Sequence, residues 1–107
     1  MKNSAVVVLT TVSNEAEAES LARKIVAAKL AACVQILPPM RSVYYWENAV
    51  HAASEQLLLI KTLSAKFDEL QAFIQANHRY DTPEIIALEA GAVAENYLDW
   101  MVNYLKS

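Results

Sequence analysis

The order of apolar segments predicts an α+β fold with the split βαβ, ferredoxin-like arrangement. Three observations lead to this prediction. A β-branched run over residues 5–12 precedes an amphipathic helical segment. A long hairpin pattern occupies residues 40–62, and a second helix, a short strand and a final helix follow it. The expected order is strand, helix, strand, strand, helix, strand and helix, in one domain that spans residues 1–107.

The composition describes a small, apolar chain. It has 107 residues, of which 55% are apolar, with a net charge of −3, one cysteine and one glycine. The acidic, scattered charge argues against a nucleic-acid partner, and the lone cysteine excludes an internal disulfide framework. The apolar run near the start is too short to span a membrane, and Gly-rich phosphate loops need several glycines. We expect a cytoplasmic protein without a membrane or nucleic-acid partner.

The first strand and the first helix have the clearest local signals. Residues 5–12 are typical of a central strand that is covered on both faces. Ser13 and Asn14 offer side-chain oxygens to cap the helix that follows. Acidic residues lie in its first turns and basic residues toward its end, which matches the helix dipole. The apolar residues of this helix recur at helical spacing.

The central hairpin is the feature that points to an oligomer. Pro38 and Pro39 interrupt a strand over residues 31–37, because proline has no N–H to donate. The hairpin then has arms over 41–46 and 49–62, and Asn48 suits the turn over 47–49 because it tolerates a left-handed backbone. The second arm would span roughly 45 Å, against a diameter of roughly 35 Å for such a domain. We expect it to protrude and to be covered by another chain.

The last third of the chain completes the predicted fold. Ser64 is the expected cap of a helix that ends near Asn77. Thr82-Pro83 forces extended geometry, so a fourth strand is expected over residues 84–89. The final helix covers residues 95–105 and is apolar on more than one face, which again indicates a partner surface.

Taken together, these segments resemble the CutA-like divalent-cation-tolerance family. The stretches that carry the resemblance are 29–34, 42–46 with Pro38, 55–62, 78–85 and 97–100. They are distributed over nearly the entire chain. The resemblance implies a cytoplasmic homotrimer of ferredoxin-like subunits, whose long hairpins pair across subunit boundaries. It also implies a link to tolerance of copper and other divalent metals, and no enzymatic activity.

His78 is the residue through which the resemblance implies metal binding. Some members of the family place cysteine at the position of Thr10 and a second histidine at the position of Asn77. Of this set only His78 is present here, so Asp81 or Glu84 would have to add carboxylate ligands. We expect a divalent metal, copper or zinc, to bind weakly. The competing interpretation of His78 is a loop histidine that bonds to a neighbouring backbone group.

Six residues are candidates for a cleft between subunits: Cys33, Trp46, Glu55, Lys61, Tyr80 and Glu84. Glu55 and Lys61 project from the same face of a strand, because an even number of residues separates them. They could anchor a ligand, or form an ion pair across an interface. Cys33 is better explained as a small buried hydrophobic residue than as a soft ligand, because no base lies near it in the sequence. Tyr44 and Trp46 share one side of their strand, where interface packing accounts for them better than base stacking does.

Three functions are compatible with the sequence. The leading hypothesis is a non-catalytic homotrimer that binds a divalent cation or a small anion at clefts between subunits. A PII-like regulatory trimer that senses a small molecule would need a flexible loop, for which the tight turn at Asn48 leaves little room. A small acylphosphatase-like hydrolase would need an arginine in the loop over residues 10–14, which has none.

Overall fold

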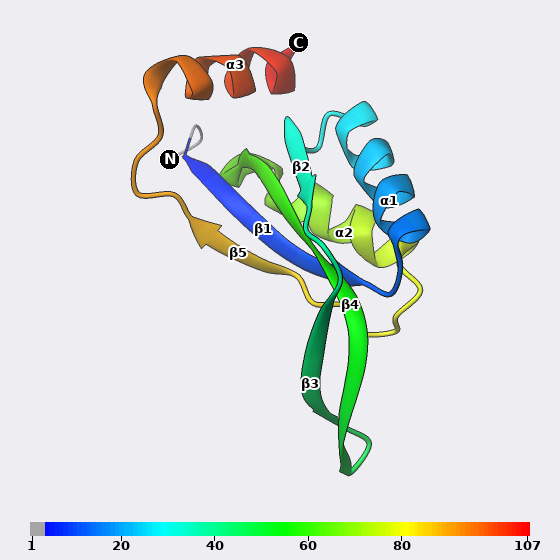
Figure 1. Ribbon diagram of the computed structural model, residues 1–107. Helices are drawn as coiled ribbons and strands as arrows, with labels where there is room; N and C mark the ends of the chain where they lie inside the picture. Colours follow the sequence, from blue (N-terminus) through cyan, green and yellow to red (C-terminus); the bar gives the residue numbers. More distant parts are fainter. Residues whose placement is uncertain (1–3) are drawn as a thin grey trace.

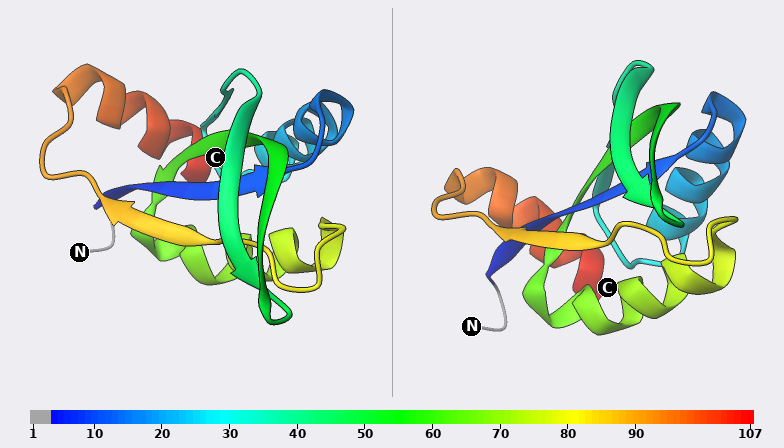
Figure 2. Two further views of the ribbon diagram at one scale, coloured as in Figure 1. Left: turned by 60° about the horizontal axis from the view of Figure 1, so that its bottom comes forward. Right: turned by 90° about the horizontal axis from the view of Figure 1, so that it is seen from below.

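An antiparallel sheet and three α-helices form the structure, a computed structural model that describes residues 4–107 (Figure 1). The strands are β1 (Ala5–Val12), β2 (Cys33–Ile36), β3 (Met40–Trp46), β4 (Ala49–Leu63) and β5 (Ile86–Glu89). The helices are α1 (Glu15–Ala27), α2 (Phe67–Asn77) and α3 (Glu95–Lys106). The strand order is β2-β4-β1-β5, and β3 pairs with the first half of β4. Both views of Figure 2 show β5 beside β1 at the edge of the sheet.

The main core lies between the sheet and the two helices α1 and α2. Val8, Leu58 and Ile60 point from the strands toward these helices and are fully buried. Ile25 of α1 and Ile74 of α2 meet them and are also fully buried. We call this side of the sheet the helical face and the opposite side the outer face. The core thus fixes which strand residues point outward.

The outer face is covered at its two ends and open between them. At one end α3 places Met101 and Leu105 against Ala5 and Leu63. At the other end the chain between α2 and β5 lies against the base of the hairpin. Between these two covers Val7, Leu9, Leu57 and Leu59 are only half-buried, and Ile86 and Leu88 of β5 are exposed.

The two prolines produce a β-bulge that changes the register of the chain. Leu37 donates its N–H to the Leu57 carbonyl, and the next pair is Met40 with Glu55. Two residues, Pro38 and Pro39, therefore oppose the single residue Gln56, which is the definition of a bulge. The Gln56 side chain donates to the Leu37 carbonyl at 3.0 Å. Because a strand alternates its side chains, the extra residue moves the even-numbered residues of β3 to the outer face.

The hairpin protrudes as the sequence predicts. Figure 1 shows it extending away from the sheet, at the opposite end of the molecule from α3. The molecule measures 44 × 26 × 24 Å along its principal axes. The turn contains Glu47 and Asn48, with φ angles of 50° and 66°. Two central residues with positive φ, joining strands paired at Trp46 and Ala49, make a type I′ turn.

Several predicted boundaries were wrong by a few residues. β2 spans 33–36 rather than 31–37, because Ala31 and Ala32 are buried in the two cores before the ladder begins. Ala49 belongs to β4 and not to the turn. Ser64 opens a short 3-10 turn, Ser64–Lys66, and α2 starts only at Phe67. β5 begins at Ile86 rather than at residue 84, because the preceding chain follows the hairpin base instead.

The N-terminal cap of α1 and the end of α2 follow the sequence closely. Asn14 accepts a hydrogen bond from the N–H of Glu17 at 2.9 Å, and Ser13 donates to the Glu17 carboxylate at 3.0 Å. α2 ends at Asn77, whose side-chain amide donates to the Phe73 carbonyl at 2.8 Å. The capping prediction for α1 and the predicted end of α2 are confirmed, because both depend on contacts a few residues apart.

Two buried threonines on the helical face provide a matched test of the core. Both are fully buried, and the Thr62 hydroxyl donates to the Leu30 carbonyl at 2.7 Å. Within residues 4–107 the Thr10 hydroxyl has no hydrogen-bond partner. We expect Thr10→Val to raise the free energy of unfolding by about 1 kcal/mol and Thr62→Val to lower it by about 1–3 kcal/mol. Chemical denaturation checks both values, and shifts of the same sign would contradict this description of the core.

The hairpin turn generates a second prediction. Glycine adopts positive φ without strain, whereas a β-branched residue resists it. We expect Asn48→Gly to be neutral or slightly stabilising and Asn48→Val to lower the free energy of unfolding by about 1–2 kcal/mol. Thermal denaturation of the two variants measures the difference. Equal melting temperatures would show that Asn48 does not have a left-handed backbone.

Candidate functional site

A groove of about 740 Å³ lies between the base of the hairpin and the chain that joins α2 to β5. We call it the hairpin groove. β3 contributes Tyr44 and Trp46, β4 contributes Glu55, and the joining chain contributes residues 80–84. Its volume is in the range of sites that hold a small ligand. The bulge at the prolines is what brings Tyr44 and Trp46 to the same face as Glu55.

Glu55 is the most deeply buried acid of the groove, with only 8% of its surface exposed. The Tyr80 hydroxyl donates to its Oε2 atom at 2.7 Å. The ion pairs among residues 4–107 are Glu19–Arg23 and Glu17–Arg79, so no cationic side chain of this part neutralises Glu55. A buried carboxylate without a cation is costly. The groove therefore carries negative charge that a positive ligand would offset.

The phenol of Tyr80 is strongly perturbed. Burial raises the pKa of this hydroxyl far above its ordinary value near 10, and the hydrogen bond to Glu55 with the charge of that carboxylate raises the pKa further. Tyr80 thus stays neutral, and its hydroxyl keeps donating a hydrogen bond to Glu55. The pair ties the joining chain to β4.

His78 positions this chain through its two ring nitrogens. Nδ1 accepts a hydrogen bond from the N–H of Tyr80 at 3.0 Å, so the proton is assigned to Nε2, which donates to the Thr11 carbonyl at 2.6 Å. The rings of His78 and Tyr80 lie 4.6 Å apart between centroids. This arrangement matches the interpretation of His78 as a loop histidine that bonds to the backbone. To ligate a metal, it would have to give up one of these bonds.

The six predicted cleft residues fall into two groups. Trp46, Glu55, Tyr80 and Glu84 line the hairpin groove together. Cys33 and Lys61 face each other on the outer surface of β2 and β4, roughly 20 Å further along β4 than Glu55. The Lys61 ammonium lies 5.7 Å from the centre of the Tyr97 ring.

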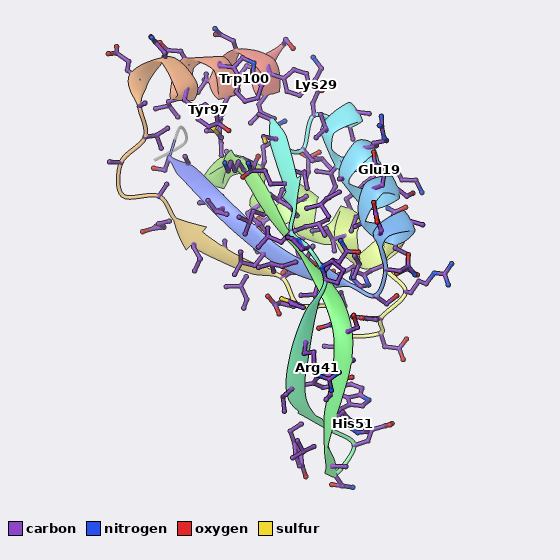
Figure 3. All side chains as sticks on the ribbon, in the orientation of Figure 1. Glu19, Lys29, Arg41, His51, Tyr97 and Trp100 are labelled. Carbon is purple, nitrogen blue, oxygen red and sulfur yellow. The ribbon has the colours of Figure 1, made fainter. Side chains whose placement is uncertain are left out.

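Figure 3 shows Tyr97 and Trp100 on α3, at the opposite end of the molecule from His51 near the hairpin tip. Burial raises the pKa of the Tyr97 phenol, and the neighbouring Cys33 thiol adds to this effect. Tyr97 therefore belongs to the group of Cys33 and Lys61, and the two groups form separate sites on the chain.

Some groove residues were missed by the sequence reasoning. Ser42 and Tyr44 line the groove with Trp46, and their spacing of two residues is the signal that could have grouped them. Thr11 also lines it, and its carbonyl accepts a hydrogen bond from His78, which lies 67 residues further along the chain. No local sequence pattern predicts a contact between residues so far apart.

A smaller cavity of about 310 Å³ lies behind His78, between Asn77–Arg79 and the first turns of α1. Arg79 crosses it and forms an ion pair with Glu17 at 2.9 Å. Arg79 itself is exposed, so this pair is screened by water and contributes little stability. The contact between Arg79 and Glu17 at this cavity joins the start of the chain that follows α2 to α1.

The fold and the groove together define a class of small α+β proteins that present a ligand groove at the base of a protruding hairpin. Comparison with known proteins then gives the family. The chain matches the model of the CutA1 divalent ion tolerance protein family over residues 6–104. This protein belongs to that family, and the resemblance stated from the sequence is confirmed. The family is named for divalent ion tolerance and not for a reaction.

Individual relatives agree with this assignment. "Protein CutA, chloroplastic" of Arabidopsis thaliana is 46% identical over 98 residues, which is 92% of this chain and 54% of that protein. The "Divalent-cation tolerance protein CutA" of Thermus thermophilus is 42% identical over 95 residues, covering 89% of this chain and 92% of its own. The chain spans about half the length of the chloroplastic relatives it matches.

Solved structures extend the similarity to three dimensions. CutA1 from Oryza sativa has a TM-score of 0.92 at 44% identity, over 94% of this chain and 93% of its own. The "Periplasmic divalent cation tolerance protein CutA" from Archaeoglobus fulgidus also has a TM-score of 0.92, at 35% identity, over 94% and 98% of the two chains. The α+β fold with its antiparallel sheet is thus shared. Within residues 4–107, no helix combines the length and apolarity that a membrane crossing requires.

The raised pKa of Tyr80 leads to a prediction about alkaline pH. The folded protein holds this proton more tightly than the unfolded chain, so the associated stability is complete below pH 10 and is lost as pH rises above it. We expect Tyr80→Phe to reduce the loss of stability between pH 10 and 11. Urea denaturation of the variant and of the wild type across this pH range measures the effect. Parallel pH profiles for Tyr80→Phe and the wild type would contradict the prediction.

Proposed function

We propose that this protein is a cytoplasmic, non-catalytic homotrimer of ferredoxin-like subunits that takes part in divalent metal tolerance, copper included, and binds a cation in the hairpin groove. The observation that carries the proposal is Glu55, a buried carboxylate without a cationic partner among residues 4–107, in a groove of ligand size. The strand order β2-β4-β1-β5 supports the ferredoxin-like description. Relatives are named for the chloroplast and the periplasm, so the cytoplasmic location stays a prediction.

Exposed apolar side chains support the trimer. On the far face of the hairpin from the groove, Tyr45 is 69% exposed and Val50 is 73% exposed. Ile86 and Leu88 are exposed on the open part of the outer face. An uncovered hairpin and an uncovered sheet edge of this character are the surfaces that proteins bury in assemblies. A second and a third copy of the chain are the proposed cover.

The charge of the groove favours a cation over the small anion that the sequence left open. Glu55, Asp81 and Glu84 all line it, and within the described part of the chain none of its lining residues is basic. A small anion would meet like charge there and would find no positive side chain. We therefore assign the alternative of a small anion to the separate group of residues around Lys61, and not to the hairpin groove.

A divalent metal is the cation that the family name suggests. Residues 4–107 contain no cluster of three or more histidine, cysteine, aspartate or glutamate side chains that could hold a metal. Copper or zinc would therefore have to combine donors from more than one subunit, with Glu55 or Glu84 as oxygen ligands and His78 as the nitrogen ligand. The proposal keeps the weak binding that was expected from the sequence.

The two alternative functions have less support. The hairpin turn contains only Glu47 and Asn48, whereas a PII-like regulatory trimer would use a flexible loop to sense its ligand. The loop between β1 and α1 is occupied by the Ser13 and Asn14 caps, where an acylphosphatase-like hydrolase would cradle phosphate. The comparisons support neither alternative.

The trimer gives the first test. Light scattering at micromolar concentration is expected to give three times the mass of one chain. Tyr45→Ala is the sharper measurement, because Tyr45 is mostly exposed in one subunit. If neighbouring subunits bury it, the substitution should cost about 3–5 kcal/mol, whereas an exposed residue costs about 0.5 kcal/mol or less. Ala substitution of the exposed Gln75 on α2 is the control. A monomer mass would rule out the proposed assembly.

Calorimetry with copper(II) and zinc tests the cation site. We expect weak binding to the wild type that falls at least tenfold in Glu55→Gln, because the amide keeps the shape but removes the charge. Glu89→Gln on the exposed strand β5 is the matched control and should bind as the wild type does. His78→Ala measures the contribution of the nitrogen ligand. Tight binding that survives Glu55→Gln would move the site elsewhere, with Cys33 and His51 as the next candidates.

A further inference from the structure

Aromatic rings form a second feature of the hairpin groove, independent of its charge. Tyr44, Trp46 and Tyr80 all line it, together with the buried Glu55. Tyr44 is held in place by His51, whose ring stacks on it at 5.8 Å with an interplanar angle of 22°. The face of an aromatic ring carries negative potential and attracts a cation, tryptophan most strongly. The groove thus combines one buried carboxylate with several ring faces.

This combination differs from what a bare metal ion needs. A metal requires several donor atoms at fixed short distances, and no such cluster occurs within residues 4–107. An ammonium group needs only one carboxylate as a partner, and its alkyl or aryl part gains contact with apolar ring surface. Glu55 offers that carboxylate, since its Oε2 atom is bonded to Tyr80 and no bond within the described chain engages its other oxygen.

We propose that the hairpin groove binds an organic ammonium ion, that is, a protonated or methylated amine that bears an apolar group. Glu55 faces the ammonium head, and Tyr44 packs against the apolar part, whereas Trp46, paired with Ala49, lines the far end of the groove toward the hairpin tip. The exposed carboxylates of Asp81 and Glu84 raise the local concentration of cations at the mouth of the groove. This inference rests on the proposed function, because both require the groove to accept a cation.

A pair of ligands on the unmodified protein gives the first arm of the test. Benzylammonium carries the charge and the ring, and benzyl alcohol keeps the ring without the charge. Calorimetry is expected to show saturable binding of benzylammonium and binding of the alcohol that is weaker by roughly tenfold or more, the difference expected from a charged hydrogen bond and cation–π contact. Equal affinities, or no binding of benzylammonium at millimolar concentration, would overturn the inference.

Variants of the assembled protein form the second arm. Glu55→Gln should weaken benzylammonium binding by roughly ten- to a hundredfold, whereas Glu89→Gln outside the groove should leave it unchanged. Tyr44→Leu should weaken it by roughly fivefold or more, whereas Tyr44→Phe, which keeps an aromatic face, should retain most of the affinity. Thermal denaturation checks that each variant is folded. If Tyr44→Leu and Tyr44→Phe bind equally, the aromatic part of the inference is overturned.

Zinc titrations on the same samples separate this inference from the proposed function. Zinc should lose affinity in Glu55→Gln but keep it in Tyr44→Leu, because a metal ion is held by donor atoms and not by contact with a ring face. Zinc binding with no benzylammonium binding would overturn the organic ligand and leave the cation site intact. If neither ligand binds, both the inference and the proposed function fail. Benzylammonium binding alone would keep the groove as a cation site and assign it to organic amines.

Discussion

The absence of two backbone N–H groups at Pro38 and Pro39 is the constraint on which the rest of the groove depends. Neither proline can donate to the ladder with β4, so the strand cannot continue in register. The chain accommodates them as an extra residue opposite Gln56, whose side chain satisfies the Leu37 carbonyl. Without this shift the ring of Trp46 would point to the opposite face of the sheet from Glu55. One local covalent feature thus decides which side chains of β3 face the groove.

The joining chain after α2 forms the opposite wall of the groove, and it is held by few bonds. His78 connects it to the Thr11 carbonyl on β1, and Tyr80 connects it to Glu55 on β4. Both bonds link segments more than twenty residues apart, and the Tyr80 side chain contacts Glu55 directly. The same contacts that fold this chain against the sheet therefore create a buried negative charge.

The sequence predicted local features well and long-range ones poorly. The cap at Asn14, the end of α2 at Asn77 and the positive φ at Asn48 follow from neighbouring residues, and the structure bears them out. The grouping of Trp46, Glu55, Tyr80 and Glu84 came from the family resemblance and from strand alternation. The separation of Cys33 and Lys61 from that group was not foreseen, because it depends on how far each lies along the same long strand β4.

Metal binding through His78 was the weakest of the sequence arguments for a physical reason. A histidine next to aspartate and glutamate in sequence can ligate a metal only if one ring nitrogen is free to do so, and here both are bonded to backbone groups, the N–H of Tyr80 and the carbonyl of Thr11. Sequence spacing does not show whether the ring nitrogens of a histidine are already hydrogen-bonded. Conversely, a glutamate at the start of an apolar stretch gives no sign that it will be buried, since the burial of Glu55 results from the tyrosine that folds over it. The chemical character of the groove therefore arises from tertiary packing, and Glu55 rather than His78 is the residue around which a ligand would be organised.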